Sequence, residues 1–472
     1  MAKHTHHKRM RYIHNKQVEK RNKKKKNVAL INSPKEFYVD NSTELGIDNT
    51  YPLGLLQISS TLKKDGHNVN YLDANFYHKN INEIADFIKD CRPDIVGMNT
   101  TFPNLDLALK VAEDIKKIDN RIRIVLGGPA SSLAPETFIQ HNQIDYVVAG
   151  EGEHAMKLLT RHPNDPYMVP SLYFKQNGRI FSTEKASNIP IDQTPMIDVE
   201  NIPKELKKYS KEIMLMTSRG CKSACSYCST PAMWGKGKKN LRTQSVERIF
   251  AELENYQSNG FDFNQVYFLD DNFTNDWAKL NAFIDRWNEE YARAGYSWKC
   301  LSRIRGINDK TRLEKISESN CYALKVGVES SSNETLRKIG KGLTIEEVDR
   351  FIENTKQFPI KTKGFFMIGF PWETEDDVMN TIEYAVNSGF DDIAVNIVMA
   401  YPSTNLYDYV YGRNSSITPG IETKEINTLE GQAGKYLAKY GSKPTVSLSE
   451  HVSLDYLIEA KKLAFEAFYD GR

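Results

Sequence analysis

Hydrophobic and polar positions repeat along most of the chain with two different periods. Short runs of β-branched and other apolar residues alternate with stretches whose apolar positions recur at helical spacing, a pattern typical of parallel sheets with crossover helices. Helical segments such as Leu105–Lys117 separate the runs of a first series. In that series we expect strands at Asn27–Asn32, Asn68–Leu72, Asp94–Asn99, Ile122–Gly127 and Ile144–Val148. This order predicts an open, doubly wound, Rossmann-like α/β domain.

A second series follows further along the chain. Its helical segments include Val246–Tyr256 and Thr374–Val386. The expected strands are Ile213–Thr217, Gln265–Leu269, Trp298–Ser302, Ala323–Val328, Lys363–Ile368 and Ile393–Val398. Repeated β/α units of this kind predict a partial (β/α)6 barrel, in which the chemistry gathers at the C-terminal ends of the strands.

The two series divide the chain into domains. Between them lies a stretch rich in Pro, Asn and turn signals, which we expect to have little structure beyond a hairpin at Asn177-Gly178. Near the end of the chain, a polar loop precedes an amphipathic helix at Leu454–Phe468, which we expect to pack on the barrel. The predicted parts are a tail at 1–26, a first domain at 27–161, a linker at 162–205, a barrel at 206–410 and a C-terminal loop and helix at 411–472.

Composition narrows the class of protein. A hydrophobic content of 40% with 24 Tyr and 21 Phe can supply sizeable cores, so we expect a globular chain. We find no apolar run long enough to span a membrane and no apolar segment of a secretory signal, so we expect a cytoplasmic location. The chain has six cysteines, which indicate ligands in a reducing compartment rather than a disulfide framework.

Positive charge is concentrated at the N-terminus. The whole chain has a formal net charge of +2, yet residues 1–26 contain eleven Lys or Arg and a single acid, Glu19. We expect a disordered, solvated extension there. The alternative is contact with nucleic acid through its phosphates, and this tail is the one place where the sequence suggests such a partner.

Three cysteines follow the first strand of the second series. Cys221, Cys225 and Cys228 form a C-x₃-C-x₂-C loop where a barrel places its active site. Three thiolates on a tight loop can each bind one iron of a cubane and leave the fourth iron open. The alternatives are a structural zinc site, for which no neighbouring Cys or His supplies a fourth ligand at a recognised spacing, and three buried thiols, which would not gather in a loop with Gly and Ser.

This loop resembles the signature of the radical S-adenosylmethionine superfamily, including the aromatic Tyr227 before the third cysteine. The resemblance implies a [4Fe-4S] cluster whose open iron chelates the amino and carboxylate groups of S-adenosylmethionine. It also implies reductive cleavage to methionine and a 5′-deoxyadenosyl radical, with an external one-electron reductant such as flavodoxin or ferredoxin. Tyr227 would then lie near the adenine, although ordinary packing is the alternative.

Polar residues end the next strands. Asp270 and Asp271 stand where the family often contacts the methionine amino group, and Glu329 stands in a segment similar to the one whose glutamate binds the ribose hydroxyls. Arg303 is a candidate partner for the methionine carboxylate, because a guanidinium fork matches a carboxylate; a surface salt bridge is the alternative.

Glycine-rich loops end the strands of the first domain. Gly127-Gly128 follows the fourth strand, Gly150-Glu151 follows the fifth, and Asn99 ends the third. The G-x-G-x-x-G spacing of dinucleotide sites is missing. Together with Pro52–Leu55, these loops resemble the cobalamin-binding domain that precedes many radical S-adenosylmethionine barrels.

That resemblance has one departure. In many cobalamin proteins a D-x-H-x-x-G motif supplies a histidine below the cobalt, whereas here Asn49 and Tyr51 stand at the Asp and His positions before Gly54. The resemblance therefore implies cobalamin bound near Tyr51 without a histidine ligand; the alternative is a domain that has lost cobalamin.

The expected activity is cobalamin-dependent methylation of an unactivated carbon in a small-molecule or natural-product substrate. One alternative is a related radical enzyme that forms rings or rearranges its substrate without methyl transfer. The other is a non-catalytic cobalamin or redox sensor. The sequence identifies neither the substrate nor the oligomeric state.

Overall fold

The computed structural model describes residues 25–35, 50–186, 188–412 and 447–469. Most of the predicted basic tail, Asn49, and most of the polar loop before the last helix lie outside these ranges. The chain forms two compact units. Within the described residues, the first contains 25–35, 51–189 apart from residue 187, and 194–201. The second contains Thr50, 190–193 and every described residue from 202 onward.

The first unit is built on a seven-stranded sheet with the order β2-β1-β3-β4-β5-β6-β7. Its parallel strands are β1 Asn27–Asn32, β2 Asn68–Asp73, β3 Ile95–Asn99, β4 Arg123–Gly127 and β5 Tyr146–Val148. The buried sequence of β1 (VALIN after Asn27) is typical of a strand covered on both faces. The doubly wound prediction is confirmed, and the order 2-1-3-4-5 places its switch point between β1 and β3.

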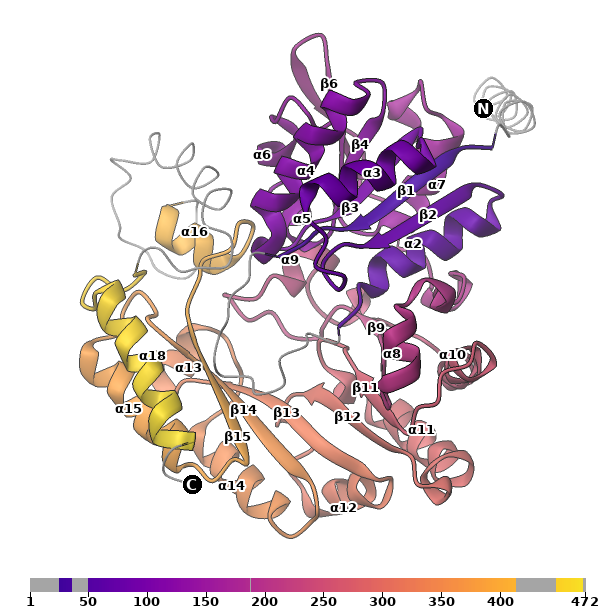
Figure 1. Cartoon of the computed structure of the whole chain (residues 1–472). Helices are drawn as coiled ribbons and strands as arrows, with labels where there is room; N and C mark the ends of the chain where they lie inside the picture. Colours follow the sequence, from indigo (N-terminus) through magenta and orange to yellow (C-terminus); the bar gives the residue numbers. More distant parts are fainter. Residues whose placement is uncertain (1–24, 36–49, 187, 413–446, 470–472) are drawn as a thin grey trace, which may run out of the picture. The chain divides into compact units, whose positions relative to one another are not determined.

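Helices cover both faces of this sheet (Figure 1). Helix α2, Leu53–Lys64, packs beside α7, Gly152–Arg161. Helix α3, Ile81–Cys91, packs beside α4, Leu105–Ile118. An Asn80 capping box starts α3, which explains why this short amphipathic segment begins where it does.

The stretch expected to be a linker differs from that expectation. Its hairpin forms at Asn177-Gly178, where both residues have positive φ, as a two-residue hairpin turn requires. However, the flanking strands β6 Leu172–Gln176 and β7 Arg179–Ser182 extend the first sheet, because β6 pairs antiparallel with β5. Phe174 is buried by this pairing, and its apolar contacts explain why the hairpin joins the sheet.

The second unit contains a parallel six-stranded sheet with the order β15-β14-β13-β12-β11-β8. Its strands are β8 Glu212–Leu215, β11 Gln265–Phe268, β12 Ser297–Ser302, β13 Cys321–Glu329, β14 Lys361–Ile368 and β15 Asp392–Ile397. The helices between them include α10 Val246–Ser258, α11 Trp277–Glu290, α12 Lys310–Glu318, α14 Ile345–Thr355 and α15 Glu375–Asn387. Along the chain, each of these strands pairs with the strand of the next β/α unit. The predicted partial (β/α)6 barrel is therefore confirmed.

Two details of this unit add to the prediction. The first strand ends at Leu215, and a separate short strand β9, Ser218–Arg219, pairs antiparallel with β10, Arg242–Thr243. The final helix α18, Leu454–Tyr469, packs against α15 and β15 as expected (Figure 1). Among the described residues, no helix is long and apolar enough to cross a membrane.

Candidate functional site

The cysteine loop lies between β9 and the short helix α9, Thr230–Trp234. It starts at Gly220, whose φ is +91° and whose Cβ, if present, would lie 2.8 Å from the Asn240 carbonyl oxygen. Glycine is therefore required at this turn. Cys225 is buried, Cys221 and Cys228 are partly exposed, and all three are free thiols.

Backbone hydrogen bonds fix this loop over the strand ends of the barrel. The Ser226 amide donates to the Ile339 carbonyl at 2.9 Å, and the Ser226 carbonyl accepts from the Leu406 amide at 2.8 Å. Lys222 Nζ donates to the Asn275 carbonyl. These partners follow β13, β15 and β11, so the loop lies at the rim where a barrel holds its active site.

A cation faces the buried thiol. Arg303 Nη1 donates to Cys225 Sγ at 3.3 Å. Burial acts to lower the pKa of Arg303, but the neighbouring thiols outweigh it and the pKa is raised. Burial raises the pKa of Cys228, while hydrogen bonds from Thr230 oppose this. Free thiols are soft sulfur donors, and three of them on one loop fit an iron–sulfur cluster.

The fit concerns the chemistry of the donors. In the ranges that the structure describes, no three Cys, His, Asp or Glu side chains already converge on one metal position. Ligation of a cluster by Cys221, Cys225 and Cys228 therefore stays a prediction.

Glu329 forms a buried ion pair at the end of β13. Lys341 Nζ lies 2.5 Å from Glu329 Oε1, and both side chains are less than a tenth exposed. Gly327 makes room for the pair, because a Cβ there would lie 2.3 Å from Glu329 Oε1. The β13–β14 register shifts between Gly327 and Glu329, and Glu329 has φ +82°, unusual for a residue with a side chain. This irregularity turns the carboxylate out of the ladder.

Lys341 is a site residue that sequence reasoning misses. Besides pairing with Glu329, its carbonyl accepts a hydrogen bond from Arg303 Nη2, so it joins two of the predicted residues. The only signal is a lysine between Gly340 and Gly342, both of which have positive φ. Such a turn is common, and the pairing depends on how the chain folds back after β13.

Tyr227 lies against the same strand end. Its ring meets that of Phe370 edge-on, with centroids 6.4 Å apart. Burial, and then the neighbouring carboxylate of Glu329, raise the pKa of Tyr227 well above its usual value. The aromatic residue of the cysteine motif is thus next to the residue predicted to bind ribose, and its role in binding adenine stays a prediction.

The two aspartates after β11 differ in their contacts. Asp270 is fully buried and accepts hydrogen bonds from the Thr217 amide and hydroxyl, both at 3.1 Å. It therefore fastens the end of β8 to the end of β11. Asp271 accepts from the Gly220 amide and the Thr230 hydroxyl at the base of the cysteine loop. Of the two aspartates, Asp271 is the one the structure places beside the cysteines.

The turn after β14 is held by Glu373. Its carboxylate accepts hydrogen bonds from the Gly369 and Phe370 amides at 2.8 and 3.0 Å. Burial raises the pKa of Glu373 to about 7. Phe370 and Trp372 stack in this turn with centroids 5.6 Å apart. These contacts give the turn a structural role.

In the first unit, three loops at the C-terminal edge of the sheet are joined into one rim. The Thr100 amide and hydroxyl donate to the Gly127 carbonyl at 2.7 and 2.8 Å. The Ser132 hydroxyl donates to the Gly128 carbonyl at 2.7 Å and accepts from the Gly150 amide at 2.9 Å. The loops after β3, β4 and β5 therefore form what we call the glycine rim: Asn99, Thr100, Gly127, Gly128 and Gly150.

The glycine rim fits a bulky ligand. Gly128 has φ +97°, and a Cβ there would lie 2.3 Å from Asn99 Oδ1 and 2.7 Å from the Thr100 carbonyl oxygen. By contrast, a Cβ on Gly127 or Gly150 would meet nothing within 4 Å, which leaves their backbones accessible. These glycines lie at the edge of a doubly wound sheet where its switch point is. Because they have no side chain there, a flat ligand can lie against their backbone.

The other predicted residues of this unit lie at two helix starts. Tyr51 is buried just before α2. Glu151 precedes Gly152, the first residue of α7, and is partly exposed. The Gly150 amide, next to Glu151, takes part in the hydrogen bonding of the rim. Sequence reasoning misses Thr100 of the rim and Ser132, which links Gly128 to Gly150, because hydroxyl residues near strand ends carry no distinct signal.

Comparisons with known proteins agree with both units. The B12 binding domain family matches residues 48–160. The radical SAM superfamily matches residues 215–385. The uncharacterized methyltransferase PH0819 of Pyrococcus horikoshii is 31% identical over 378 residues, which cover 78% of this chain and 80% of that protein.

Two more distant proteins are similar over most of the chain. The cytidylyl-2-hydroxyethylphosphonate methyltransferase of Streptomyces wedmorensis is 24% identical over 413 residues, covering 72% of this chain and 74% of that protein. The structure of the radical S-adenosylmethionine methyltransferase TsrM from Kitasatospora setae, with cobalamin and a [4Fe-4S] cluster bound, matches with a TM-score of 0.67 and 15% identity. It covers 84% of this chain and 80% of that chain, and it shows a common fold. The chain therefore belongs to the radical S-adenosylmethionine enzymes with a B12-binding domain, whose cofactors are a [4Fe-4S] cluster, S-adenosylmethionine and cobalamin.

Proposed function

We propose that this enzyme methylates an unactivated carbon of a small-molecule substrate. The observation that carries the proposal is the presence, in one chain, of three free thiols beside Arg303 at a barrel rim and of a glycine rim in a B12-binding fold. The methyltransferase name of the relative at 31% identity supports methyl transfer over ring formation or rearrangement.

The cysteine loop and its neighbours would bind the cluster and S-adenosylmethionine. Cys221, Cys225 and Cys228 would supply three thiolates, and we assign Arg303, which donates to Cys225 Sγ, to the carboxylate of S-adenosylmethionine. Asp271, at the base of the same loop, is the acid that we assign to the amino group.

Glu329 and Tyr227 would hold the nucleoside part. Lys341 donates to Glu329 Oε1 and so orients this carboxylate, which we assign to the ribose hydroxyls. Tyr227 presents a ring beside it, and we assign adenine to that ring. We assign Asp270 a bracing role, through Thr217, besides the contact with the methionine amino group that its position suggests.

The glycine rim would bind cobalamin through backbone groups. Gly127 and Gly150 leave space, Gly128 permits the turn, and Asn99 lies beside that turn. Tyr51 stands where many cobalamin proteins have their cobalt-binding histidine, so the chain supplies no imidazole there, and Glu151 is a peripheral candidate. Bound together, the three cofactors supply hydrogen abstraction from the substrate carbon and the methyl group that replaces the hydrogen.

The partners follow from this chemistry. Reductive cleavage of S-adenosylmethionine needs an electron from outside the chain, so we assign an external one-electron donor such as flavodoxin or ferredoxin. Three thiols that must stay reduced also point to a reducing compartment, such as the cytoplasm. The substrate is a small molecule or natural product.

The test uses the anaerobically reconstituted full chain with cobalamin, reductant and S-adenosylmethionine bearing a trideuteriomethyl group. Incubated with a small-molecule extract of the source cells, the enzyme should produce a compound that carries the labelled methyl group on carbon. Cys225→Ala should give none, whereas Cys91→Ala, which removes a partly exposed thiol in α3, should act like the native enzyme. Formation of 5′-deoxyadenosine with a product of altered bonding but no added methyl would contradict methyl transfer and support the alternative.

A further inference from the structure

A pocket of about 830 Å³ lies in the first unit at the edge of the sheet opposite the glycine rim. It is formed by the starts of β1, β3 and β4 and by the ends of α3 and α4. Because the five strands from β1 to β5 run parallel, this edge faces away from the strand ends that carry the predicted cobalamin site. The proposed methyl transfer gives it no role.

The lining of this pocket is basic. Five cationic side chains line it against two acids, and we call it the basic pocket. The charged lining residues are Lys26, Lys89, Arg92, Arg121, Arg123, Asp94 and Asp119. Asp94 accepts from the Asn27 amide at 2.9 Å and from Lys26 Nζ at 3.4 Å. Asp119 is bound by Arg121 through two hydrogen bonds of 3.0 and 2.8 Å. Each acid is thus already neutralised by a neighbour.

Two arginines keep their charge unmatched. Arg92, just after α3, is exposed, and no described residue forms an ion pair or hydrogen bond with its guanidinium. Arg123, at the start of β4, donates to the Tyr146 hydroxyl and to Asn164 Oδ1, both at 3.1 Å. These partners orient the Arg123 side chain but carry no charge. The Arg123 guanidinium is held by neutral partners, and the Arg92 guanidinium lines the same pocket. Together they can bind an anion.

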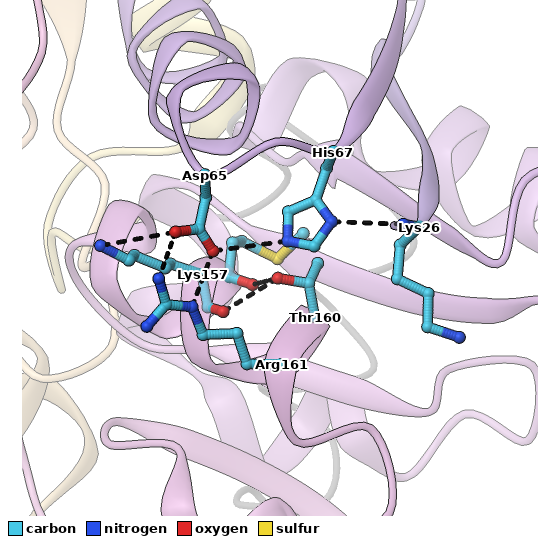
Figure 2. A network of polar contacts seen from close by, with 7 residues as sticks. Lys26, Asp65, His67, Lys157, Thr160 and Arg161 are labelled. Carbon is cyan, nitrogen blue, oxygen red and sulfur yellow. Dashed lines mark hydrogen bonds and ion pairs between the residues drawn. The ribbon is translucent and has the colours of Figure 1, made fainter. Parts of the chain in front are cut away.

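The highly charged N-terminal segment ends at this pocket. Four consecutive lysines precede β1, and Lys26 is both the last of them and a lining residue. The Lys26 amide donates to His67 Nδ1 at 3.3 Å (Figure 2). His67 Nε2 in turn lies 3.5 Å from Asp65 Oδ2.

The same network is tied to the end of α7. Arg161 binds the Asp65 carboxylate through two hydrogen bonds, one of them 2.7 Å, and Lys157 Nζ lies 3.8 Å from it (Figure 2). Asp65 and His67 are both buried side chains, each less than a tenth exposed. A buried network of this kind fixes the backbone of Lys26 where the chain enters β1, at the rim of the basic pocket.

We propose that the basic pocket binds the phosphates of a nucleic acid. Residues 1–26 contain eleven Lys or Arg in a chain whose net charge is only +2, so the rest of the chain is acidic and would repel a polyanion elsewhere. Arginine forks match phosphate oxygens, and contacts of this kind to the phosphates position a nucleic acid on a protein.

The lining argues against a membrane surface as the partner. None of the large apolar side chains that are exposed in the described residues lines the pocket. A lipid surface usually engages such side chains together with the basic ones. The inference does not depend on the proposed methyl transfer, since it rests on another edge of the first unit.

The test measures binding of the full-length, cobalamin-loaded protein to a fluorescein-labelled single-stranded RNA and to the DNA of the same sequence. Fluorescence anisotropy gives Kd between about 50 and 200 mM salt. We expect Kd to rise steeply with salt. Arg92→Glu should weaken binding about five- to tenfold and reduce the salt dependence, because it replaces a phosphate-binding charge. Arg92 has no described side-chain partner, so the variant should fold normally.

Two further variants complete the test. Arg350→Glu makes the same charge change on the exposed face of α14 and should alter Kd less than about twofold. Arg123→Lys keeps a charge but loses the fork, and should weaken binding by less than Arg92→Glu. Absence of binding by the native protein, equal effects of Arg92→Glu and Arg350→Glu, or binding to anionic lipid vesicles without binding to nucleic acid would overturn the proposal. Bound cobalamin, measured for each variant, shows that the first unit is intact.

Discussion

Replacement of Gly128 by alanine tests whether the glycine rim depends on backbone that only glycine can adopt. Gly128 has φ +97° and ψ −178°. Residues with a Cβ rarely adopt this backbone conformation, which costs them about 1–3 kcal/mol. The new Cβ would also lie 2.7 Å from the Thr100 carbonyl oxygen, a backbone atom that cannot move without breaking its bond to the Ala130 amide. Relieving this overlap adds about 1–3 kcal/mol.

The expected loss is therefore about 2–6 kcal/mol, a large part of the stability of a single domain. Gly127→Ala is the matched control, because Gly127 has ordinary φ and a Cβ there would meet nothing within 4 Å. We expect that control to change stability by less than about 0.5 kcal/mol. Hydrogen exchange in increasing urea, followed by mass spectrometry of peptides from β3 and β4 in the full-length protein, measures the free energy of opening in this unit.

Equal stability of the two variants would refute the reasoning, because the rim would then accept a side chain at Gly128 as easily as at Gly127. A similar loss of stability in Gly128→Ala and Gly127→Ala would also contradict the reasoning, since the space beside Gly127 is open. Titration with cobalamin adds a second readout, and we expect binding to Gly128→Ala to weaken by about tenfold or more, because its loop can no longer hold the position shown by the native rim.

Three further predictions concern the barrel. Lys341→Met should destabilise the barrel by about 3–5 kcal/mol, because it leaves the buried Glu329 charge unpaired; the double variant with Glu329→Gln should recover most of this in denaturant unfolding, and a purely additive result would contradict the pairing. Burial raises the pKa of Glu373 from 4.5 to about 7, so its contribution favours the fold at low pH and is lost as the pH rises across that window. Glu373→Gln should remove a pH dependence of at most about 3 kcal/mol, measured by unfolding at several pH values, and an unchanged pH profile would contradict the raised pKa. Thr217→Val should destabilise the protein by about 1–3 kcal/mol, because it leaves Asp270 without one of its hydrogen bonds; thermal unfolding measures it, and a neutral effect would argue against the bracing role.

Hydrophobic patterning predicts most of the fold, because parallel strands that are buried on both faces consist of short apolar runs in the sequence. The strands from β1 to β5 and the six barrel strands lie within a few residues of the expected ranges. The position of the hairpin after α7 follows from its Asn-Gly turn, but its pairing does not. Whether β6 adds to an existing sheet depends on contacts of Phe174 with residues far away in the chain, which no local pattern reveals.

For the candidate site, too, some residues can be recognised from the local sequence and others cannot. The spacing of Cys221, Cys225 and Cys228 is local and can be recognised from the sequence. The roles of Asp270 and Asp271 cannot be separated there, since neighbouring residues at a strand end point to opposite sides and only the structure shows which one meets Thr217. Lys341 escapes sequence reasoning because its partner Glu329 lies twelve residues earlier, across a helix and two turns.

The central claim is that the cysteine loop holds the cluster that cleaves S-adenosylmethionine, independently of the B12-binding unit. The most direct measurement is 5′-deoxyadenosine formation by the reconstituted, dithionite-reduced protein, together with its iron and cobalamin content. We expect the native protein to form 5′-deoxyadenosine, and Cys225→Ala to lose both iron and product while it retains cobalamin. Undiminished 5′-deoxyadenosine formation by Cys225→Ala, or none by the fully loaded native protein, would contradict the account.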